Sequence, residues 1–217
     1  MSHAFADITF TPAVKAAQAR DGSRANYARS FEADGDLFND RLSDSEREFI
    51  AAQRSLYMAT VSETGWPYLQ HRGGPRGFVK VLDDKTLGFA DYAGNRQFIS
   101  VGNLAVNDRV AMILMDYTQR VRLKLLGRLA VRDLADDAAL ASRLIDAGYR
   151  ARPQRAMLIT VDGFDWNCPQ HIPVRVDSED VQRALDERDQ RIAALELRLE
   201  ALPGQTDGPA AGPSAPS

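Results

Sequence analysis

The 217-residue chain has a single cysteine, Cys168, which excludes a disulfide framework and any zinc site built from paired thiolates. Only three histidines, His3, His71 and His171, are scattered along it, so a metal centre is a poor first hypothesis. No apolar run approaches the roughly 20 residues that a membrane-spanning helix needs, and the N-terminus lacks the basic and apolar regions of a secretory signal. These absences predict a soluble cytoplasmic protein without a membrane segment.

An excess of charge of one sign is also missing, because 27 Lys and Arg stand against 30 Asp and Glu. A net charge of −3 argues against nucleic acid or a membrane surface as a partner recognised through bulk charge. Hydrophobic residues make up 44% of the chain and charged residues 26%, which is the composition of a globular protein with a sizeable core.

Residues 41–176 are predicted to form one β-rich domain. Runs of β-branched and aromatic residues between turn residues predict strands at 56–62, 68–72, 78–82, 86–91, 110–117, 121–132 and 156–162. A helix is predicted at 43–53, before the first strand, and helical patterns interrupt the strands at 96–106 and 136–147. About six strands with two interrupting helices favour a small barrel. Residues 1–40 are predicted to be an N-terminal arm that wraps this domain.

The C-terminal region has a different pattern. Apolar residues alternate at spacings of four and three from Val181 to Leu202, with Arg188 in one slot, which predicts an amphipathic, coiled-coil-like helix over 177–202. Such a helix packs either on its own domain or against a second copy. Residues 203–217 are rich in Pro, Gly, Ala and Ser and are predicted to be disordered.

A first candidate site lies at residues 93–100, with the sequence AGNRQFIS. Gly94 permits a tight turn, and Asn95 is a good N-cap for the helix that follows. The first turn of a helix carries unpaired N–H groups and the positive end of its dipole, so it suits a phosphate. Arg96 and Gln97 would add donors there. An ordinary capped helix with an exposed arginine fits the same pattern.

A second candidate is the glycine-rich stretch 70–77, QHRGGPRG. Gly73 and Gly74 let the backbone approach a ligand closely, and Arg72 and Arg76 lie beside them. The stretch joins a strand to a strand, so it is not a dinucleotide-binding loop, which joins a strand to a helix. A β-bulge with solvated arginines is the structural alternative.

Two further segments carry chemistry-bearing residues. On the strand that begins at Val121, alternation places Arg120, Arg122 and Lys124 on one face, either solvated or facing a phosphate-bearing cofactor or an acidic partner. The irregular segment 165–171, DWNCPQH, would make a good rim for a planar heterocycle. Its cysteine would need activation by a base to act as a nucleophile, and a buried structural thiol is the favoured interpretation.

These motifs, in this order, resemble the pyridoxamine 5′-phosphate oxidase-related proteins with the FMN-binding split-barrel fold. The resemblance is carried by WPYLQHRGGPRGFVKVLDDKTLGFADYAGNRQFISVGNLAVNDRVAMILMDY, then RVRLKLLGRLAV, then DWNCPQHI, and covers about residues 41–173. It implies a mainly β protein, a six-stranded antiparallel split barrel with flanking helices. It also implies a two-fold homodimer with one FMN in each of two clefts at the interface.

The resemblance also implies the cofactor-binding residues. His71, Arg72, Gly73 and Gly74 would lie beside the flavin, and Asn95, Arg96 and Gln97 would surround its phosphate. Arg122 would approach the flavin from a neighbouring strand pair, with Trp166, Asn167 and Gln170 contributed across the dimer interface. The chain departs from true pyridoxamine phosphate oxidases, because an acidic heptad helix stands where they carry an arginine-rich substrate motif.

The sequence therefore predicts an FMN-binding oxidoreductase that passes a hydride or electron pair from a reduced pyridine nucleotide or another small molecule through the flavin. A non-catalytic flavin-binding or sensing protein that docks to a partner reductase is the alternative. Haem or deazaflavin on the same barrel is a third reading, for which only His71 and His171 could supply an axial haem ligand. No residue stands out as a catalytic acid or base.

Overall fold

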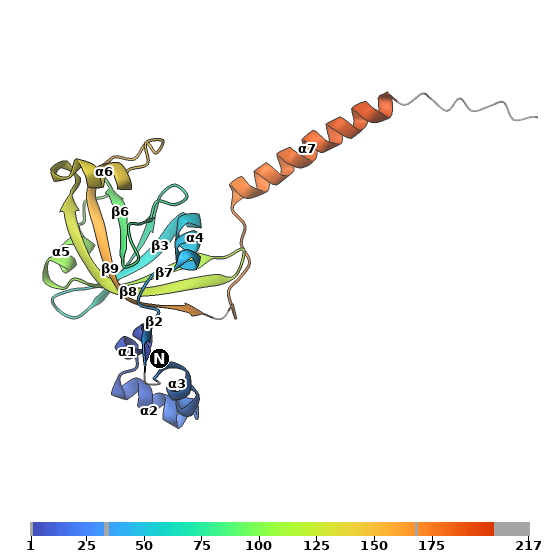
Figure 1. Cartoon of the computed structure of the whole chain (residues 1–217). Helices are drawn as coiled ribbons and strands as arrows, with labels where there is room; N and C mark the ends of the chain where they lie inside the picture. Colours follow the sequence, from blue (N-terminus) through green and yellow to red (C-terminus); the bar gives the residue numbers. More distant parts are fainter. Residues whose placement is uncertain (1, 33–34, 168, 202–217) are drawn as a thin grey trace, which may run out of the picture. The chain divides into compact units, whose positions relative to one another are not determined.

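Seven strands pair into one antiparallel sheet in the computed structural model, which describes residues 2–32, 35–167 and 169–201 (Figure 1). Their order is β4-β3-β7-β8-β9-β6-β5. The strands are β3 (Ser55–Val61), β4 (Pro67–Gly73), β5 (Lys80–Val81), β6 (Thr86–Tyr92), β7 (Arg109–Asp116), β8 (Val121–Asp133) and β9 (Pro153–Asn167). The predicted mainly β architecture is confirmed, and the seven strands correspond to the seven predicted strand segments, one more than the six expected of the split barrel.

Alternation along the strands gives the sheet a core face and an outer face. In β3, Leu56, Met58 and Thr60 are buried, while the residues between them are only partly covered. The register continues the outer side across three strands, since Ala59 is opposite Ala111 and Ala111 is opposite Leu126. We call this side of β4, β3, β7 and β8 the outer sheet face, and its apolar members are Tyr57, Ala59, Val61, Leu69, Ala111, Ile113, Met115 and Leu126.

Two strand predictions are corrected by the structure. The strand expected at 78–82 shrinks to β5, because the Phe78 N–H bonds the carbonyl of Pro75 in a turn and the Phe78 ring enters the core. The strand expected to end at residue 162 continues to Asn167, because the long β8 offers it partners as far as Arg122. The segment predicted to be irregular at 165–171 is therefore strand for its first three residues, 165–167.

Four helices or helical turns accompany the sheet. They are α4 (Asp44–Ala52), α5 (Ile99–Val106), the 3-10 turn η1 (Leu134–Asp136) and α6 (Ala138–Leu144). The first agrees with prediction, whereas α5 begins three residues late and the helix expected at 136–147 is shortened to α6. The shortening follows from the Asp137 carboxylate, which accepts from the Leu140 N–H and starts the helix anew.

The N-terminal residues, predicted to be an arm, contain three short helices. Helices α1 (Ala4–Thr9), α2 (Pro12–Arg20) and α3 (Arg24–Phe31) follow the short strand β1 (Ser2–His3), which pairs in parallel with β2 (Leu37–Phe38). Helix α1 packs against β9, and a Cβ on Gly163 would come within 2.7 Å of the Phe5 nitrogen. Glycine at that position is what lets this helix dock so closely.

Residues 175–217 form a second unit, and α7 (Ser178–Glu200) is its helix. The helix predicted over 177–202 is thus present, although Leu202 and the tail predicted to be disordered at 203–217 lie outside the described residues. None of the α7 side chains is buried. No helix in the described part of the chain is long and apolar enough to cross a membrane.

Candidate functional site

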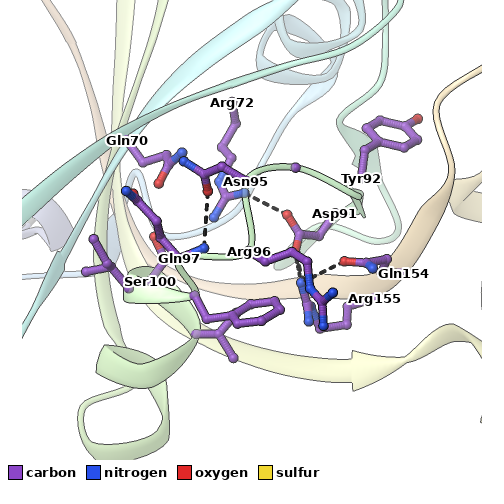
Figure 2. A pocket seen from close by; sticks show the side chains of 14 residues that line it. Gln70, Arg72, Asp91, Tyr92, Asn95, Arg96, Gln97, Ser100, Gln154 and Arg155 are labelled. Atoms are coloured by element: carbon purple, nitrogen blue, oxygen red, sulfur yellow. Dashed lines mark hydrogen bonds and ion pairs between the residues drawn. The ribbon is translucent and has the colours of Figure 1, made fainter.

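A cavity of about 260 Å³ opens where β6 ends and α5 begins. Its walls come from β4, the end of β6, the loop before α5 and the start of β9, so residues distant in the sequence meet there (Figure 2). The lining residues are Gln70, Arg72, Asp91, Tyr92, Gly94–Val101, Gln154 and Arg155. The cavity thus collects four of the predicted cofactor-binding residues, Arg72, Asn95, Arg96 and Gln97.

The carboxylate of Asp91 is the centre of the polar wall. It is only 4% exposed, and two arginines approach it from different strands, Arg72 from β4 and Arg155 from β9 (Figure 2). Arg72 Nη1 lies 2.6 Å from Oδ1, and Arg155 donates to Oδ2 through Nη2 at 2.9 Å and Nε at 3.1 Å. Charge-assisted bonds of this kind fix the orientation of both guanidinium groups.

The loop before α5 has an unusual backbone. Arg96 and Phe98 adopt left-handed conformations, with φ of 61° and 54°, which residues other than glycine rarely take. The predicted helix start at Arg96 is therefore wrong, and Asn95 is not an N-cap. Its side-chain oxygen instead accepts from the Gln97 N–H at 3.2 Å, a local turn that competes with helix. Such outliers concentrate at ligand-binding sites.

The N-terminus of α5 has no side-chain cap. Ser100, in its first turn, is 2% exposed and lines the cavity, yet its hydroxyl has no hydrogen-bond partner among the described residues. The Nε of Arg72 is likewise buried without a partner. Buried polar groups are nearly always paired, so these two donors are open to a water or a ligand in the cavity.

The electrostatics of the cavity favour an anion. Arg72, Arg96 and Arg155 stand against the one carboxylate of Asp91 among the lining residues. The first turn of α5 adds the positive end of a helix dipole. Tyr92 contributes a neutral wall, because burial, reinforced by Asp146, raises the pKa of its hydroxyl. A phosphate group fits this donor set in charge, and an unpaired serine hydroxyl fits its oxygens.

The other glycine-rich residues divide between a second cavity and the scaffold. His71, Arg72 and Gly73 line an adjoining cavity of about 140 Å³. The His71 ring lies on the outer sheet face, 5.5 Å from that of Tyr57 in an edge-to-face contact. Gly74 serves packing, because a Cβ there would approach Phe78 to 2.6 Å.

The remaining predicted residues lie at the far end of β8 and β9. Arg122 is paired with Asn167, whereas Asp133, eleven positions further along β8, is paired with Arg155 at the cavity. This places Arg122 roughly 35 Å from the cavity along the strand. Its Nε is buried and has no partner in the described part of the chain. Within one chain, the structure therefore does not bring Arg122 together with the cavity.

Trp166 is engaged in holding α4. Its indole nitrogen donates to the Glu46 carboxylate at 2.7 Å, and its ring meets Phe49 edge-to-face at 4.8 Å. Gln170 is exposed after the end of β9. The side chain of Asn167 and the whole of Cys168 lie outside what the structure describes, so the prediction that the thiol is structural stays a prediction.

Sequence reasoning missed Asp91, Ser100, Gln154 and Arg155. The one sequence signal for Asp91 was its place as a carboxylate at the end of an otherwise apolar strand. Arg155 gave no signal, because it follows another arginine by three residues in a stretch without periodicity. Their roles depend on the pairing of β6 with β9, which no local pattern reveals. No group of three or more histidine, cysteine, aspartate or glutamate residues that could hold a metal occurs in the described residues.

A comparison with models of protein families identifies the family of the chain. A protein-family model described as pyridoxamine 5′-phosphate oxidase matches residues 42–165, more than half of the chain. None of the curated proteins compared with the chain matches it.

Several solved structures are similar at low identity. HupZ of Group A Streptococcus is 16% identical, with 62% of this chain and 99% of that chain covered and a TM-score of 0.44. An FMN-binding protein of Syntrophomonas wolfei is 13% identical, with coverage of 56% and 83% and a TM-score of 0.43. A Clostridium acetobutylicum protein of the pyridoxinephosphate oxidase family is 16% identical, with coverage of 57% and 85% and a TM-score of 0.41. On the match of the family model, the chain belongs to the pyridoxamine 5′-phosphate oxidase family.

Proposed function

We propose that the chain is a homodimeric FMN-dependent oxidoreductase, and that the cavity between β6, β9 and α5 holds the phosphate of the cofactor. The observation that carries this proposal is the buried Ser100 hydroxyl, which has no partner among the described residues although it lines a cavity with three arginines. A buried donor left unpaired costs about 1–3 kcal/mol, and a bound phosphate oxygen would remove that penalty.

Several residues of the cavity have a definite task in this proposal. Arg96 and Gln97 donate to the phosphate from the loop, and Ser100 donates from the first turn of α5. Asp91 is a positioning residue, because it orients Arg72 and Arg155 without touching the anion itself. Arg155 is held from the other side by the Phe98 ring, whose centroid lies 4.9 Å from its guanidinium carbon.

We propose a second chain because the predicted site residues lie at opposite ends of β8 and β9 within one chain. The outer sheet face has an apolar centre, and a hollow of about 500 Å³ there is lined by Ala59, Val61, Ala111 and Leu126, with Arg109, Arg128 and Asp162 at its edge. Leu69, on the same face, is 64% exposed. An exposed apolar face of this kind is typical of a contact between subunits. Pairing two such faces would let Arg122 and the end of β9 reach the flavin bound by the partner.

The flavin, when bound, supplies the oxidation–reduction chemistry, with a reduced pyridine nucleotide or another small molecule as donor. The chain's own contribution is to hold the cofactor and to place donors where negative charge develops. Arg122 is the proposed donor toward the N1–C2=O edge of the ring, and its unpaired, buried Nε supports that role. No side chain at the cavity is proposed as a catalytic acid or base.

The first test is the absorbance spectrum of the purified protein, with one FMN expected per chain. Arg96→Ala should weaken FMN binding by about 1.5–3 kcal/mol, the loss of a charge-assisted contact. Arg29→Ala, which removes an exposed arginine of α3, is the matched control and should leave the affinity unchanged. Equal affinities for the two variants would remove Arg96 from the site.

Ser100→Ala separates a binding role from a structural one. Because the hydroxyl bonds nothing in the described chain, its removal should leave the unfolding free energy of the FMN-free protein unchanged or slightly higher. FMN affinity should fall by about 1 kcal/mol or more. Loss of stability with unchanged affinity would mean that the hydroxyl serves the fold.

Tight FMN binding without oxidation of reduced pyridine nucleotides would favour the flavin-storing or sensing alternative.

A further inference from the structure

Helix α7 presents an apolar seam to solvent. The seam residues Val181, Leu185, Ile192, Leu195 and Leu199 are between 37% and 67% exposed in the single chain. Their spacing assigns Leu185, Ile192 and Leu199 to heptad position a and Val181, Arg188 and Leu195 to position d. Five apolar side chains left exposed on one face of a 23-residue helix call for a partner helix.

We propose that α7 pairs with α7 of a second copy of this chain as a parallel, in-register, two-stranded coiled coil. The charged residues beside the seam determine whether the two helices pair in parallel or antiparallel orientation. Position e holds Gln182, Asp189 and Glu196, whereas position g holds Ala184, Arg191 and Arg198. The e side of the helix is therefore acidic, and the g side is basic.

Parallel and antiparallel pairing differ in which of these sides meet. In a parallel pair, position g of one helix faces position e of the other, which sets Arg191 beside Glu196 twice. In the antiparallel register that aligns Leu185 with Leu195, e faces e and g faces g. That arrangement would set Asp189 against Asp189 and Arg191 against Arg191, and like charges at these positions repel.

Arg188 fixes the register. In the parallel pair, the two Arg188 side chains share one d layer, and the Asp189 carboxylate of each helix offsets the repulsion between these two like charges. Within the chain, Arg188 Nη2 already lies 3.0 Å from Asp189 Oδ1. A slip of one heptad would set each Arg188 against Val181 or Leu195 and would bury its charge without a matching layer. One polar layer of this kind selects register at some cost in stability.

The seam spans about three heptads, which is marginal for an isolated coiled coil. A second contact between the two chains would raise the effective concentration of one α7 for the other. The proposal needs no bound flavin, so its failure and the failure of the proposed function are separable by measuring FMN content in the same samples.

Disulfide formation in the full-length chain tests orientation and register together. In a Cys168→Ser background, Leu185→Cys should form a disulfide-linked dimer on mild oxidation, because equivalent a positions face each other only in the parallel register. Gln190→Cys, on the outward f position, is the control and should remain monomeric in denaturing gels. A disulfide that forms only when Leu185→Cys and Leu195→Cys chains are mixed would show antiparallel pairing. Equal yields for Leu185→Cys and Gln190→Cys would show that α7 does not pair. Either result overturns the proposal.

A charge exchange tests the e–g contacts. Arg191→Glu and Glu196→Arg each create two like-charge contacts in a parallel homodimer, but together they restore two attractive pairs in each heterodimer. Co-expressed as differently tagged Leu185→Cys chains, the two variants should give more heterodimer than the half that random pairing yields. A share at or below one half would contradict the parallel arrangement.

Discussion

The two ends of β9 each bury a carboxylate, but they neutralise it in different ways. Glu46, beside the C-terminal end of the strand, is 5% exposed and accepts from neutral donors: the Ser43 N–H at 2.9 Å and the Trp166 indole at 2.7 Å. Asp91, beside the N-terminal end, is 4% exposed and lies between two arginines. The first arrangement is complete within the chain, whereas the second leaves positive charge in excess.

The helices at these two ends show the same contrast. Helix α4 begins with a capping box, so the Glu46 carboxylate occupies the N-terminal end where an external anion would otherwise bind. Burial opposes ionisation of Glu46, but hydrogen bonds from Ser43 and Trp166 outweigh it and lower the pKa of this carboxyl. Helix α5 has no such residue, and the Ser100 hydroxyl in its first turn has no hydrogen-bond partner among the residues that the structure describes. The comparison shows that the N-terminus of α4 is capped by the chain's own side chains, whereas the N-terminus of α5 is open to a ligand.

The largest expected effect is that of Asp91→Asn, which removes the charge between Arg72 and Arg155. Breaking a buried ion pair from one side costs about 3–5 kcal/mol, so the unfolding free energy in urea should fall by that order. Asp84→Asn is the control, because its partner Arg41 forms an exposed ion pair and the loss should be about 1 kcal/mol or less. Added inorganic phosphate should restore part of the stability of the Asp91 variant. Equal losses for the two variants would refute the importance assigned to Asp91.

At the opposite end, Glu46→Gln should cost about 1 kcal/mol at neutral pH, since an amide oxygen still accepts but the helix loses its charged cap. The pKa of Glu46 is lowered in the folded chain, so its contribution is present above the ordinary value of 4.5 and is lost as the pH falls below it. Urea unfolding at pH 7 and pH 4 should therefore show the gap between wild type and variant narrowing. Glu48→Gln, on the exposed side of α4, should show neither the loss nor the narrowing.

A smaller effect is expected from His3, which packs near the same end of β9. Burial lowers the pKa of its imidazole, although the neighbouring Asp165 acts in the opposite direction. Because the folded chain favours the neutral ring, stability is complete above the ordinary pKa of 6.5 and declines as the pH falls below it. His3→Gln should flatten the dependence of the unfolding free energy on pH between pH 7.5 and pH 5. Parallel curves for the two proteins would contradict this.

The smallest effect is expected from removing α7. A chain that ends at Asp177 should remain dimeric in sedimentation and should keep its flavin, because the outer sheet face offers the larger apolar contact and α7 the smaller one. A monomeric product would make α7 the main dimerisation element and would refute the proposed contact between sheet faces.

Much of the sheet could be predicted from sequence because its signals are local. Alternation of apolar residues located β3, β4, β6, β7 and β8 to within one residue at most of their ends, and Ser43 with Glu46 marked the start of α4. The end of β9 could not be predicted in this way. Phe164–Asn167 are strand only because β8 provides partners at that point, which is a property of the pairing and not of the segment.

The candidate site was predictable where one stretch of chain supplies it. Gly94 to Gln97 drew attention through a turn residue followed by donors, and all four line the cavity. The reason given for them was wrong, because Asn95 closes a short turn and the helix begins at Ile99. Arg155 and Asp91 are 64 residues apart in sequence and meet because their strands pair, so no local pattern could have indicated the contact.

At Arg96, the left-handed backbone makes the stability of the fold and the binding of an anion favour different residues. A non-glycine residue in this conformation costs about 1–2 kcal/mol relative to one that adopts it freely, so glycine at position 96 would relax the loop of the empty protein. The same exchange would remove a guanidinium from the rim of the cavity. Selection for heat resistance alone would therefore favour glycine here and would weaken the proposed cofactor site, whereas selection for binding of the proposed cofactor would keep the arginine.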